Sequence, residues 1–515
     1  MEDTICIVGA GSTCLAFVHY YTEKMKALPP GAPKTLYVIE KSEEFGCGVA
    51  YASDLSSNIL NTKSGSISPF IDKPGDFFQW LGSNKAMVSR CFPDFAMVTD
   101  SYAPRPLFGA YLKDRFKTSI KDAAAVGVNV VQIFAEVTDI VRTLRGYLIY
   151  TSCGVSLKCG SVFMMCGTLA PRQAEGQQEA SMLAHPYPVS QLPSVVRSDD
   201  AVAVIGSRLS CIDTVIALFE NGHKGEVTIY SRSGYFPSVR GTQGRIVPRY
   251  LTEDYFDDLL RKSLPLTLDQ LVGLVTKEIA HQGGMTRSDF VAPQAPQDIV
   301  AFLKEELEKS TCPRPWQAVL YATNKVVGTI WALLSAADKK MFIDKYFSVF
   351  MSYRVSIPSE NAQKILNYLS SGQLRFVRGQ HTVVASSANE VVVQEEGGAV
   401  RHYGKLINAT GSPRDISRLD SALISKLMAH NYISPNSYGG LCIDRTSYRA
   451  INALGQIEDG LHVVGELTNG EFFFTSALDI NSTHAYRCCE NYFARLAERA
   501  YATQTHEHFG ASVML

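Results

Sequence analysis

The amino-acid sequence predicts an α/β fold with two parallel-sheet domains and a helical insertion, on three observations. Residues 4–21, TICIVGAGSTCLAFVHYY, place an apolar β-branched run before a glycine turn and a helix-like stretch. Residues 202–218, VAVIGSRLSCIDTVIAL, repeat that order. A third stretch, residues 251–345, contains runs of helical periodicity such as QDIVAFLKEELEKS. In a chain of 515 residues, these features favour two Rossmann-like dinucleotide-binding domains.

The order of these segments predicts domains that are discontinuous in the sequence. Apolar runs at 160–168 and 404–413 end in small-residue turns, as expected for strands where the chain crosses between two nucleotide-binding domains. The helical insertion is expected to wall the active site. The predicted parts are a first domain at 1–195 and 401–515, a second domain at 196–250 and 346–400, and the insertion at 251–345.

The first glycine turn has the sequence context of an adenine-dinucleotide site. Gly9 and Gly11 would supply the tight turn and the close approach to a pyrophosphate, and Ser12 opens the helix. Cys14 stands at the third glycine position of G-x-G-x-x-G, a mild departure where a small residue serves packing. A second β-like run, TLYVIEKS, contains Glu40, whose carboxylate can accept both hydroxyls of an adenosine ribose. A carboxylate there favours FAD or NAD over NADP.

The last strand-and-helix segment favours FAD. Residues 460–480, GLHVVGELTNGEFFFTSALDI, place Gly465 and Glu466 between a strand and a long helix. The ribityl-phosphate chain and the pyrimidine edge of a flavin would be held there, at the positive end of the helix. A closing βα unit without a ligand is the structural alternative. We also include Val137 among the candidate FAD-binding residues.

The second glycine turn predicts a modified NADPH site. Gly206 closes the strand, and Ser207 could donate to a phosphate at the start of the helix. Arg208 replaces a glycine, and its side chain, turned outward, would add positive charge beside that phosphate. The next strand ends at Arg232, where an arginine can bind the 2′-phosphate that a carboxylate would repel. A degenerate unit kept for packing is the alternative.

Composition excludes several other classes of function. The formal net charge of -1 gives no basic excess for nucleic acid. Twelve scattered cysteines, without a C-x-x-C pair, fit reduced thiols rather than disulfides, and no histidine spacing suggests a metal. No apolar run is long enough to span a bilayer, and the chain starts almost directly in a strand. We therefore expect a cytoplasmic protein without a signal peptide, a membrane segment or a metal; a homo-oligomer is left open.

Four segments carry a resemblance to a known family. Residues 43–81, EEFGCGVAYASDLSSNILNTKSGSISPFIDKPGDFFQWL, are similar to the block after the second strand of the bacterial-type FAD-NAD(P)-binding proteins. Residues 102–116, 316–358 and 465–480 resemble three further blocks of that family. The family includes amino-acid N-monooxygenases of the aspartate type, distantly related to lysine and ornithine N-hydroxylases. The resemblance implies FAD and NADPH as cofactors and a small-molecule amine and O2 as substrates.

In such a monooxygenase the flavin performs the difficult chemistry. The resemblance implies that NADPH reduces FAD, that oxygen is captured as a C4a-hydroperoxide, and that a neutral amine of a small amino acid attacks it. The protein must keep this intermediate dry and hydrogen-bonded. Asn61 matches a family position beside the flavin ring, although it could equally cap a turn. Thr475 and Ser476 could hydrogen-bond the flavin edge, so these three residues are the catalytic candidates.

Arginines are the candidates for binding an anionic substrate, because their forks match carboxylates. Arg105 and Arg354 lie in family-matched segments, and Arg354 is preferred. Lys63, which replaces a usual proline of the family, could contact substrate or the NADP phosphate.

Two other classes of function remain open on the sequence. One is a flavin oxidase, or a C- or S-oxygenase, with a degenerate nicotinamide site. The other is a non-catalytic flavin-binding protein that uses the helical insertion as a partner surface.

Overall fold

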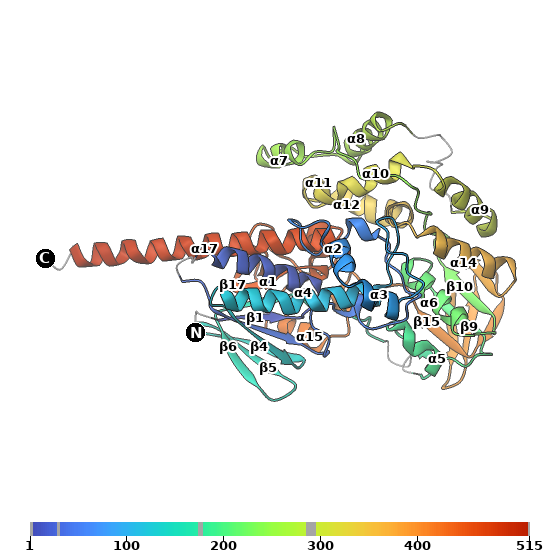
Figure 1. Ribbon diagram of the computed structural model, residues 1–515, viewed down its shortest axis with the longest axis horizontal. Coiled ribbons are helices and arrows are strands. Elements are labelled where there is room, and N and C mark those ends of the chain that lie inside the picture. Colours follow the sequence, from blue (N-terminus) through green and yellow to red (C-terminus); the bar gives the residue numbers. More distant parts are fainter. Residues whose placement is uncertain (1–3, 28–30, 174–178, 285–294, 513–515) are drawn as a thin grey trace. The chain divides into compact units, whose positions relative to one another are not determined.

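The chain forms two compact units in a computed structural model, which describes residues 4–27, 31–173, 179–284 and 295–512, with side chains up to residue 501 (Figure 1). The first unit contains residues 1–52, 62–169 and 414–515, and the second contains residues 53–61 and 170–413. Each unit is built around one parallel sheet.

The first unit has a six-stranded sheet in the order β16-β17-β7-β1-β2-β3. All neighbours are parallel except β16 and β17. The apolar run predicted as the first strand is therefore a central strand, and its side chains Ile5, Cys6 and Ile7 are fully buried. The strands are β1 (Thr4–Val8), β2 (Thr35–Glu40), β3 (Asn129–Phe134), β7 (Ser161–Met164), β16 (Arg449–Ile451) and β17 (Ile457–Val463).

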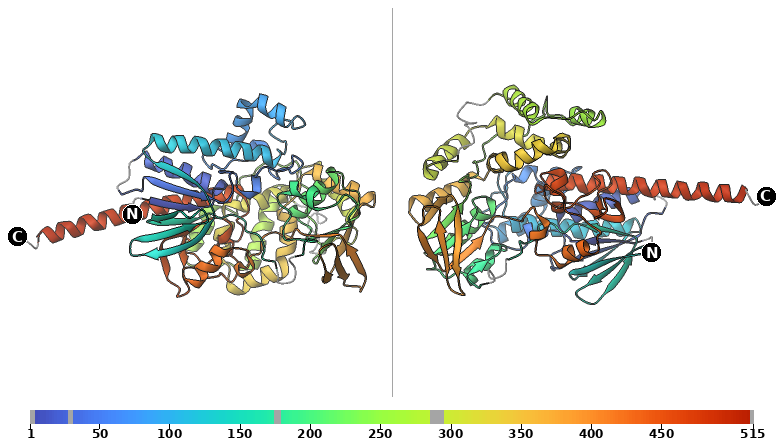
Figure 2. Two further views of the ribbon diagram at one scale, coloured as in Figure 1. Left: turned by 90° about the horizontal axis from the view of Figure 1, so that it is seen from below. Right: turned by 180° about the vertical axis from the view of Figure 1, so that it is seen from behind.

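Helices and a smaller sheet complete the first unit. Helix α1 (Ser12–Met25) packs against both α4 (Arg105–Ala125) and α17 (Leu478–Ser512), and Figure 1 shows α1 beside α17. The antiparallel strands β4 (Val137–Thr143), β5 (Gly146–Thr151) and β6 (Ser156–Cys159), teal in Figure 2, form a separate sheet. The shorter helices are α2 (Asp76–Ser83), α3 (Lys85–Cys91), α15 (Ala422–Ala429) and α16 (Asn469–Phe472).

The second unit has a five-stranded parallel sheet in the order β11-β10-β9-β15-β8. Helix α6 (Leu209–Glu220) packs its apolar side chains with those of β9, β10 and β15 in one core. The strands are β8 (Met182–Leu183), β9 (Val202–Ile205), β10 (Val227–Ser231), β11 (Leu374–Arg378) and β15 (Lys405–Asn408). A second, antiparallel sheet contains β12 (His381–Ser386), β13 (Val391–Glu395) and β14 (Val400–Tyr403).

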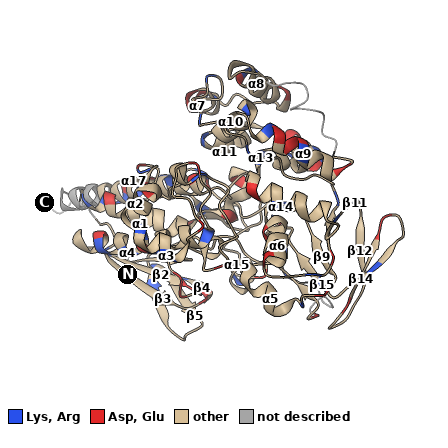
Figure 3. Ribbon diagram, turned by 45° about the vertical axis from the view of Figure 1, so that its right-hand side comes forward, with Lys and Arg blue, Asp and Glu red and all other residues tan. Residues whose placement is uncertain are grey.

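The stretch predicted as a helical insertion is helical where the structure describes it. Polar caps start several of these helices: Thr267 and Gln270 form a capping box at α8, and Asp298 caps α9. Acidic residues gather on α9 (Figure 3). The helices of the second unit are α5 (Leu192–Val195), α6, α7 (Glu253–Arg261), α8 (Leu268–His281), α9 (Ile299–Ser310), α10 (Pro315–Ala322), α11 (Val327–Leu333), α12 (Ala336–Met341), α13 (Phe347–Arg354) and α14 (Ser359–Ser370).

The chain passes from the first unit to the second between residues 169 and 170, and returns to the first between residues 413 and 414. From the sequence, these two boundaries were expected near residues 195 and 400. Strand pairing explains the difference, because β8 and β15 both join the sheet of β9. Residues 53–61 group with the second unit, where the Asp54 carboxylate accepts hydrogen bonds from the backbone N–H groups of Val189 and Ser190 at 3.0 and 2.8 Å. No helix in the described part of the chain has the length and apolar character needed to cross a bilayer.

Two buried histidines predict that the first unit loses stability in acid. Burial lowers the pKa of His462 and of His484 to about 3. His462 stacks on Phe163 with ring centroids 4.4 Å apart, and His484 Nδ1 lies 2.8 Å from the Tyr448 hydroxyl. Between pH 6.5 and 3 the unfolded state binds protons that the folded state excludes, so stability falls as pH falls. In that range each histidine lowers the free energy of unfolding by about 1.4 kcal/mol for each pH unit of acidification.

Urea unfolding monitored between pH 7.5 and 5 tests this expectation. The unfolding midpoint should drop with pH, and His484→Gln should flatten the drop. The exposed His402 provides the matched control, because His402→Gln should leave the slope unchanged. If the unfolding midpoint of His484→Gln fell with pH as steeply as that of the parent, the buried His484 would not be a source of the acid sensitivity.

Candidate functional site

The first glycine turn puts backbone without side chains, at Gly9 and Gly11, at the carboxyl end of β1. Gly9 has φ +97°, and a Cβ on it would lie 2.4 Å from the carbonyl oxygen of Met165. Gly11 precedes α1 and faces Gly48, whose Cα lies 3.6 Å from the position of a Gly11 Cβ. Gly9 is therefore required for the fold. Gly11, with room for a methyl group, instead leaves an open approach to the start of α1.

The Glu40 carboxylate lies beside this turn. It accepts a hydrogen bond from the Ala10 N–H at 2.8 Å and another from the Ser42 N–H at 3.1 Å. A carboxylate has about four lone-pair positions, so each oxygen keeps capacity for a ribose hydroxyl. The fully buried Cys14 occupies the third glycine position without displacing the helix, which accounts for its tolerance there.

Ser12 and Val137 lie at the ends of elements in the same unit. Ser12 is the first residue of α1 and is partly exposed. Val137 is the first residue of β4 and is 5% exposed. The chain reaches it directly from β3, which pairs with β2 up to Glu40. Their contact with a cofactor remains a prediction.

Four predicted residues meet after β17. Gly465 has φ +94°, and the Glu466 carboxylate accepts hydrogen bonds from the hydroxyls of Thr475 at 3.0 Å and Ser476 at 3.2 Å. The Asn469 amide donates to the other oxygen of Glu466 at 3.3 Å. Thr475 and Ser476 therefore hold Glu466 and the loop before α17 in place.

Arg414 supports the same loop and was not singled out from the sequence. Its guanidinium donates to three backbone carbonyls, those of Tyr438, Phe473 and Asn469, at 3.0, 3.1 and 2.7 Å. Burial lowers the pKa of Arg414, and nearby Glu466 acts against this lowering. Arg414 lies far from the loop in the sequence, so local patterning carries no signal for this contact.

Two carboxamide oxygens near this loop fit a ligand that donates hydrogen bonds. The Oδ1 atoms of Asn469 and Asn481 are buried without a hydrogen-bond partner within the described residues. Asn481 Oδ1 lies 4.0 Å from where a Cβ on Gly465 would be, beside Thr13 of α1. Buried acceptors without a donor are costly. With the open approach at Gly11, they make this edge of the sheet fit FAD.

The second unit has its own glycine turn. Gly206 has φ +111°, and a Cβ on it would lie 2.8 Å from the carbonyl oxygen of Ala409. The Ser207 hydroxyl lies 2.9 Å from that of Ser231 and donates to the Tyr235 carbonyl oxygen at 2.7 Å. Ser207 therefore ties the turn to the end of β10 with its side chain. Its backbone N–H at the start of α6 is left as the group suited to a phosphate.

Three arginines without acidic partners among the described residues lie at the carboxyl ends of β9, β10 and β11. Arg208 precedes α6 and lies over the Phe347 ring at 5.4 Å, where burial lowers its pKa. Arg232 is exposed just after β10, and its charge helps to lower the pKa of His381. Arg378, not singled out from the sequence, ends β11 opposite Ser231 and packs on Gly234. This uncompensated positive charge fits the phosphates of a nicotinamide nucleotide.

The remaining candidates are divided between the two units. In the first unit, Lys63 pairs with the exposed Asp100 at 3.2 Å, and Arg105 starts α4. Asn61 ends the 53–61 segment of the second unit. Arg354 is 5% exposed and donates a hydrogen bond to the Asn324 Oδ1 atom. Roles for these four residues in catalysis or substrate binding remain predictions.

The two glycines of the first turn predict different mutant behaviour. Gly9→Ala should misfold the first unit, because the new Cβ meets the Met165 carbonyl and a positive φ costs a non-glycine residue about 1–3 kcal/mol. Gly11→Ala should fold, because its Cβ would lie at an ordinary contact distance of 3.6 Å from the Gly48 Cα, and it should lose most bound flavin, because the added methyl group would crowd a pyrophosphate at the start of α1. Flavin absorbance per mole of purified protein, together with circular dichroism, separates the two outcomes. A Gly11→Ala protein with full flavin content would contradict the assignment.

Comparisons with known proteins agree with this geometry. Residues 6–169 match the family model described as FAD-NAD(P)-binding. The uncharacterized protein YdhS of Escherichia coli (strain K12) is 22% identical over 424 residues, covering 72% of this chain and 76% of that protein. The L-lysine 6-monooxygenase of Pseudomonas syringae superposes with a TM-score of 0.56 at 15% identity, over 96% of this chain and 99% of that one.

A second solved structure shows the same arrangement. The reduced ornithine hydroxylase PvdA of Pseudomonas aeruginosa gives a TM-score of 0.57 at 14% identity, again over 96% of this chain and 99% of that one. These likenesses confirm the predicted α/β fold, and the family match agrees with the expected pair of cofactors, FAD and NADPH. Residues 6–169 thus form an FAD-NAD(P)-binding domain, within a chain that has the fold of the lysine and ornithine hydroxylases.

Proposed function

We propose that this protein is an FAD-dependent, NADPH-using monooxygenase that hydroxylates the amine nitrogen of a small amino acid or related amine. The observation that carries the proposal is a group of three arginines at the end of the second parallel sheet, for which the described residues provide no acidic partner, in a chain whose residues 6–169 match an FAD-NAD(P)-binding family model. Solved structures of the same fold include enzymes that hydroxylate lysine and ornithine, which supports the choice of an amine.

The first unit provides the groups that would hold the flavin. The backbone N–H groups from Gly9 to Ser12 and the start of α1 suit the pyrophosphate, and Glu40 suits the ribose. The Asn481 carboxamide oxygen can accept a hydrogen bond from the bound cofactor. When bound, FAD supplies the chemistry that the side chains lack, which is to accept a hydride and to activate oxygen.

The second unit provides the groups that would select NADPH over NADH. Arg232 follows β10 and Arg378 ends the neighbouring parallel strand β11, where a 2′-phosphate would meet positive charge. Arg208 replaces the glycine of the usual fingerprint, and its guanidinium is held against Phe347 rather than across the turn. In this position the Arg208 side chain does not block the turn for a pyrophosphate.

Two arginines of the second unit that share one aromatic ring are the proposed substrate-binding groups. Arg354 and Arg240 both lie over the ring of Tyr321, at 4.9 and 4.3 Å from its centroid. Guanidinium groups fixed in this way suit a carboxylate, so an acidic amino acid is one candidate substrate. Lys63, Arg105 and Asn61 are further proposed contacts.

Anaerobic reduction of the purified flavoprotein tests the nucleotide part of the proposal. Flavin absorbance should bleach faster with NADPH than with NADH. Arg232→Gln combined with Arg378→Gln should weaken the apparent affinity for NADPH about 100-fold or more, since each of the two lost charge-assisted hydrogen bonds is worth about 1.5–3 kcal/mol, with little effect on NADH. Lys224→Gln, an exposed change in the same unit, is the matched control. Equal rates with both nucleotides in the parent protein would refute the assignment.

Oxygen consumption with a panel of amines tests the reaction. An acidic amino acid, lysine and ornithine should differ in how strongly they couple NADPH oxidation to hydroxylamine formation. Bleaching of the flavin by a candidate substrate without NADPH would instead identify an oxidase. No flavin reduction by any compound would favour a non-catalytic flavin protein.

A further inference from the structure

His381 lies close to the arginines to which the 2′-phosphate of NADPH is assigned. It starts β12, three residues after Arg378 ends β11. Its ring lies beside the Tyr230 ring of β10, with centroids 5.1 Å apart. Arg232 follows Tyr230 by two residues, and its charge acts on the imidazole. The imidazole is therefore a neighbour of the proposed 2′-phosphate site.

Hydrogen bonding leaves one ring nitrogen of His381 for a ligand. Nδ1 faces the carbonyl oxygen of Gly379 at 3.4 Å, and because a carbonyl can only accept, Nδ1 carries the hydrogen. In the neutral ring Nε2 is then the nitrogen without a hydrogen, and it has no hydrogen-bond partner within the described residues. A proton therefore adds at Nε2, which can then donate to a phosphate oxygen.

Two glutamates near His381 are bonded to other donors. Glu395 lies opposite His381 in the β12–β13 ladder, and its carboxylate accepts hydrogen bonds from the Tyr230 hydroxyl at 3.1 Å and from Arg401 at 2.9 Å. The Glu396 carboxylate accepts a hydrogen bond at 2.8 Å from the backbone N–H of the residue before His381. Within the described residues neither carboxylate forms an ion pair with the imidazole. A protonated His381 would therefore form an ion pair only with a ligand.

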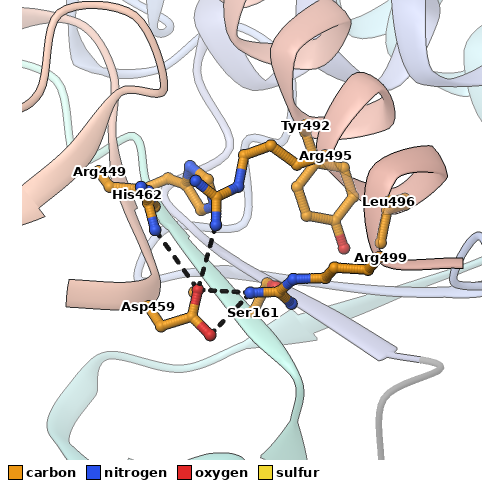
Figure 4. A pocket seen from close by; sticks show the side chains of 9 residues that line it. Ser161, Arg449, Asp459, His462, Tyr492, Arg495, Leu496 and Arg499 are labelled. Atoms are coloured by element: carbon orange, nitrogen blue, oxygen red, sulfur yellow. Dashed lines mark hydrogen bonds and ion pairs between the residues drawn. The ribbon is translucent and has the colours of Figure 1, made fainter. Parts of the chain in front are cut away.

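Arginines of the first unit show the contrasting arrangement. Arg449, Arg495 and Arg499 point at the carboxylate of Asp459 and form ion pairs with it (Figure 4). Those guanidinium groups have an anion within the fold. The arginines assigned to the 2′-phosphate have no acidic partner among the described residues, so their charge is left for a ligand.

A bound phosphate would change the charge that His381 carries. Burial and the charge of Arg232 lower the pKa of His381, against the raising effect of the hydrogen bond with the Gly379 carbonyl. The ring is therefore neutral near pH 7 when no anion is present. A 2′-phosphate is close to a dianion at that pH, and an opposite charge within about 4–6 Å favours the protonated ring.

We propose that His381 is a third cationic contact for the 2′-phosphate of NADPH, and that Nε2 takes up a proton from solvent when the phosphate binds. This role rests on the proposed function, in which Arg232 and Arg378 select NADPH. It makes the preference for NADPH over NADH depend on pH. The preference should rise as pH falls from 8 to 7, because the imidazole gains a charge while the phosphate keeps its second charge down to about pH 6.

Calorimetric titration of the flavin-containing protein with adenosine 2′,5′-bisphosphate tests this role without measuring catalysis. At pH 7, in two phosphate-free buffers of different ionisation heat, binding should take up about half a proton or more. A phosphate held by arginines alone would release protons, because positive charge lowers the pKa of the phosphate itself. ADP, which lacks the 2′-phosphate, should bind without the uptake. The parent protein alone provides this measurement.

A substitution then assigns the proton to one side chain. His381→Asn should abolish the uptake and weaken binding of the bisphosphate about tenfold at pH 7, because a charge-assisted hydrogen bond is lost. Binding of ADP should not change. His402→Gln removes an exposed histidine of β14 in the same small sheet and is the matched control. It should take up protons and bind the bisphosphate as the parent does.

The outcomes separate this role from the proposed function. Proton uptake that is absent in the parent, or that persists in His381→Asn, would overturn the role of His381. If Arg232→Gln with Arg378→Gln still removed the preference for the bisphosphate over ADP, the NADPH assignment would stand without His381. A double variant that bound the bisphosphate as tightly as the parent would overturn the NADPH assignment and this role together.

Discussion

Both parallel sheets depend on direct contact between backbone segments at the end of a central strand, β1 in the first unit and β9 in the second. In the first unit, Gly9 lies under the carbonyl of Met165, just after β7, and in the second, Gly206 lies under the carbonyl of Ala409, just after β15. Each glycine has a φ near +100°, and neither position leaves room for a Cβ. The start of the following helix is positioned by this one contact in each unit.

The sequence predicted the two glycine turns, though not the carbonyl groups that pack on them, because the signal of such a turn is local. An apolar strand, a glycine and a helix lie next to one another in the chain, so the turn can be recognised without knowing what packs on it. The Gly465–Glu466 loop was predicted for the same reason. Arg414, Arg378 and Asn481 were not singled out, because their importance comes from residues brought close by the sheets. The unit boundary near residue 413 was misplaced on similar grounds, since an apolar strand such as β15 carries no local sign of which sheet it joins.

The distribution of charge separates the stabilising ion pairs from the candidate binding groups. Arg314 and Glu306 are both buried and form a two-pronged ion pair at 2.6 and 2.9 Å, which pairs each charge with its opposite within the fold. Arg208, Arg232 and Arg378 have no such partner among the described residues. Holding cations together without matching anions costs free energy. Such arrangements are therefore where ligands of negative charge are to be sought.

The discontinuity of the first unit has a consequence for synthesis on the ribosome. Its sheet is not complete until β17 has been made, because β17 pairs with β7 and carries the loop that faces the start of α1. The sheet of the second unit ends with β15, so all of its strands leave the ribosome earlier. Domains generally fold as units once their segments are available. The nascent chain will thus hold a finished second sheet while β1, β2, β3 and β7 wait for their last parallel neighbour.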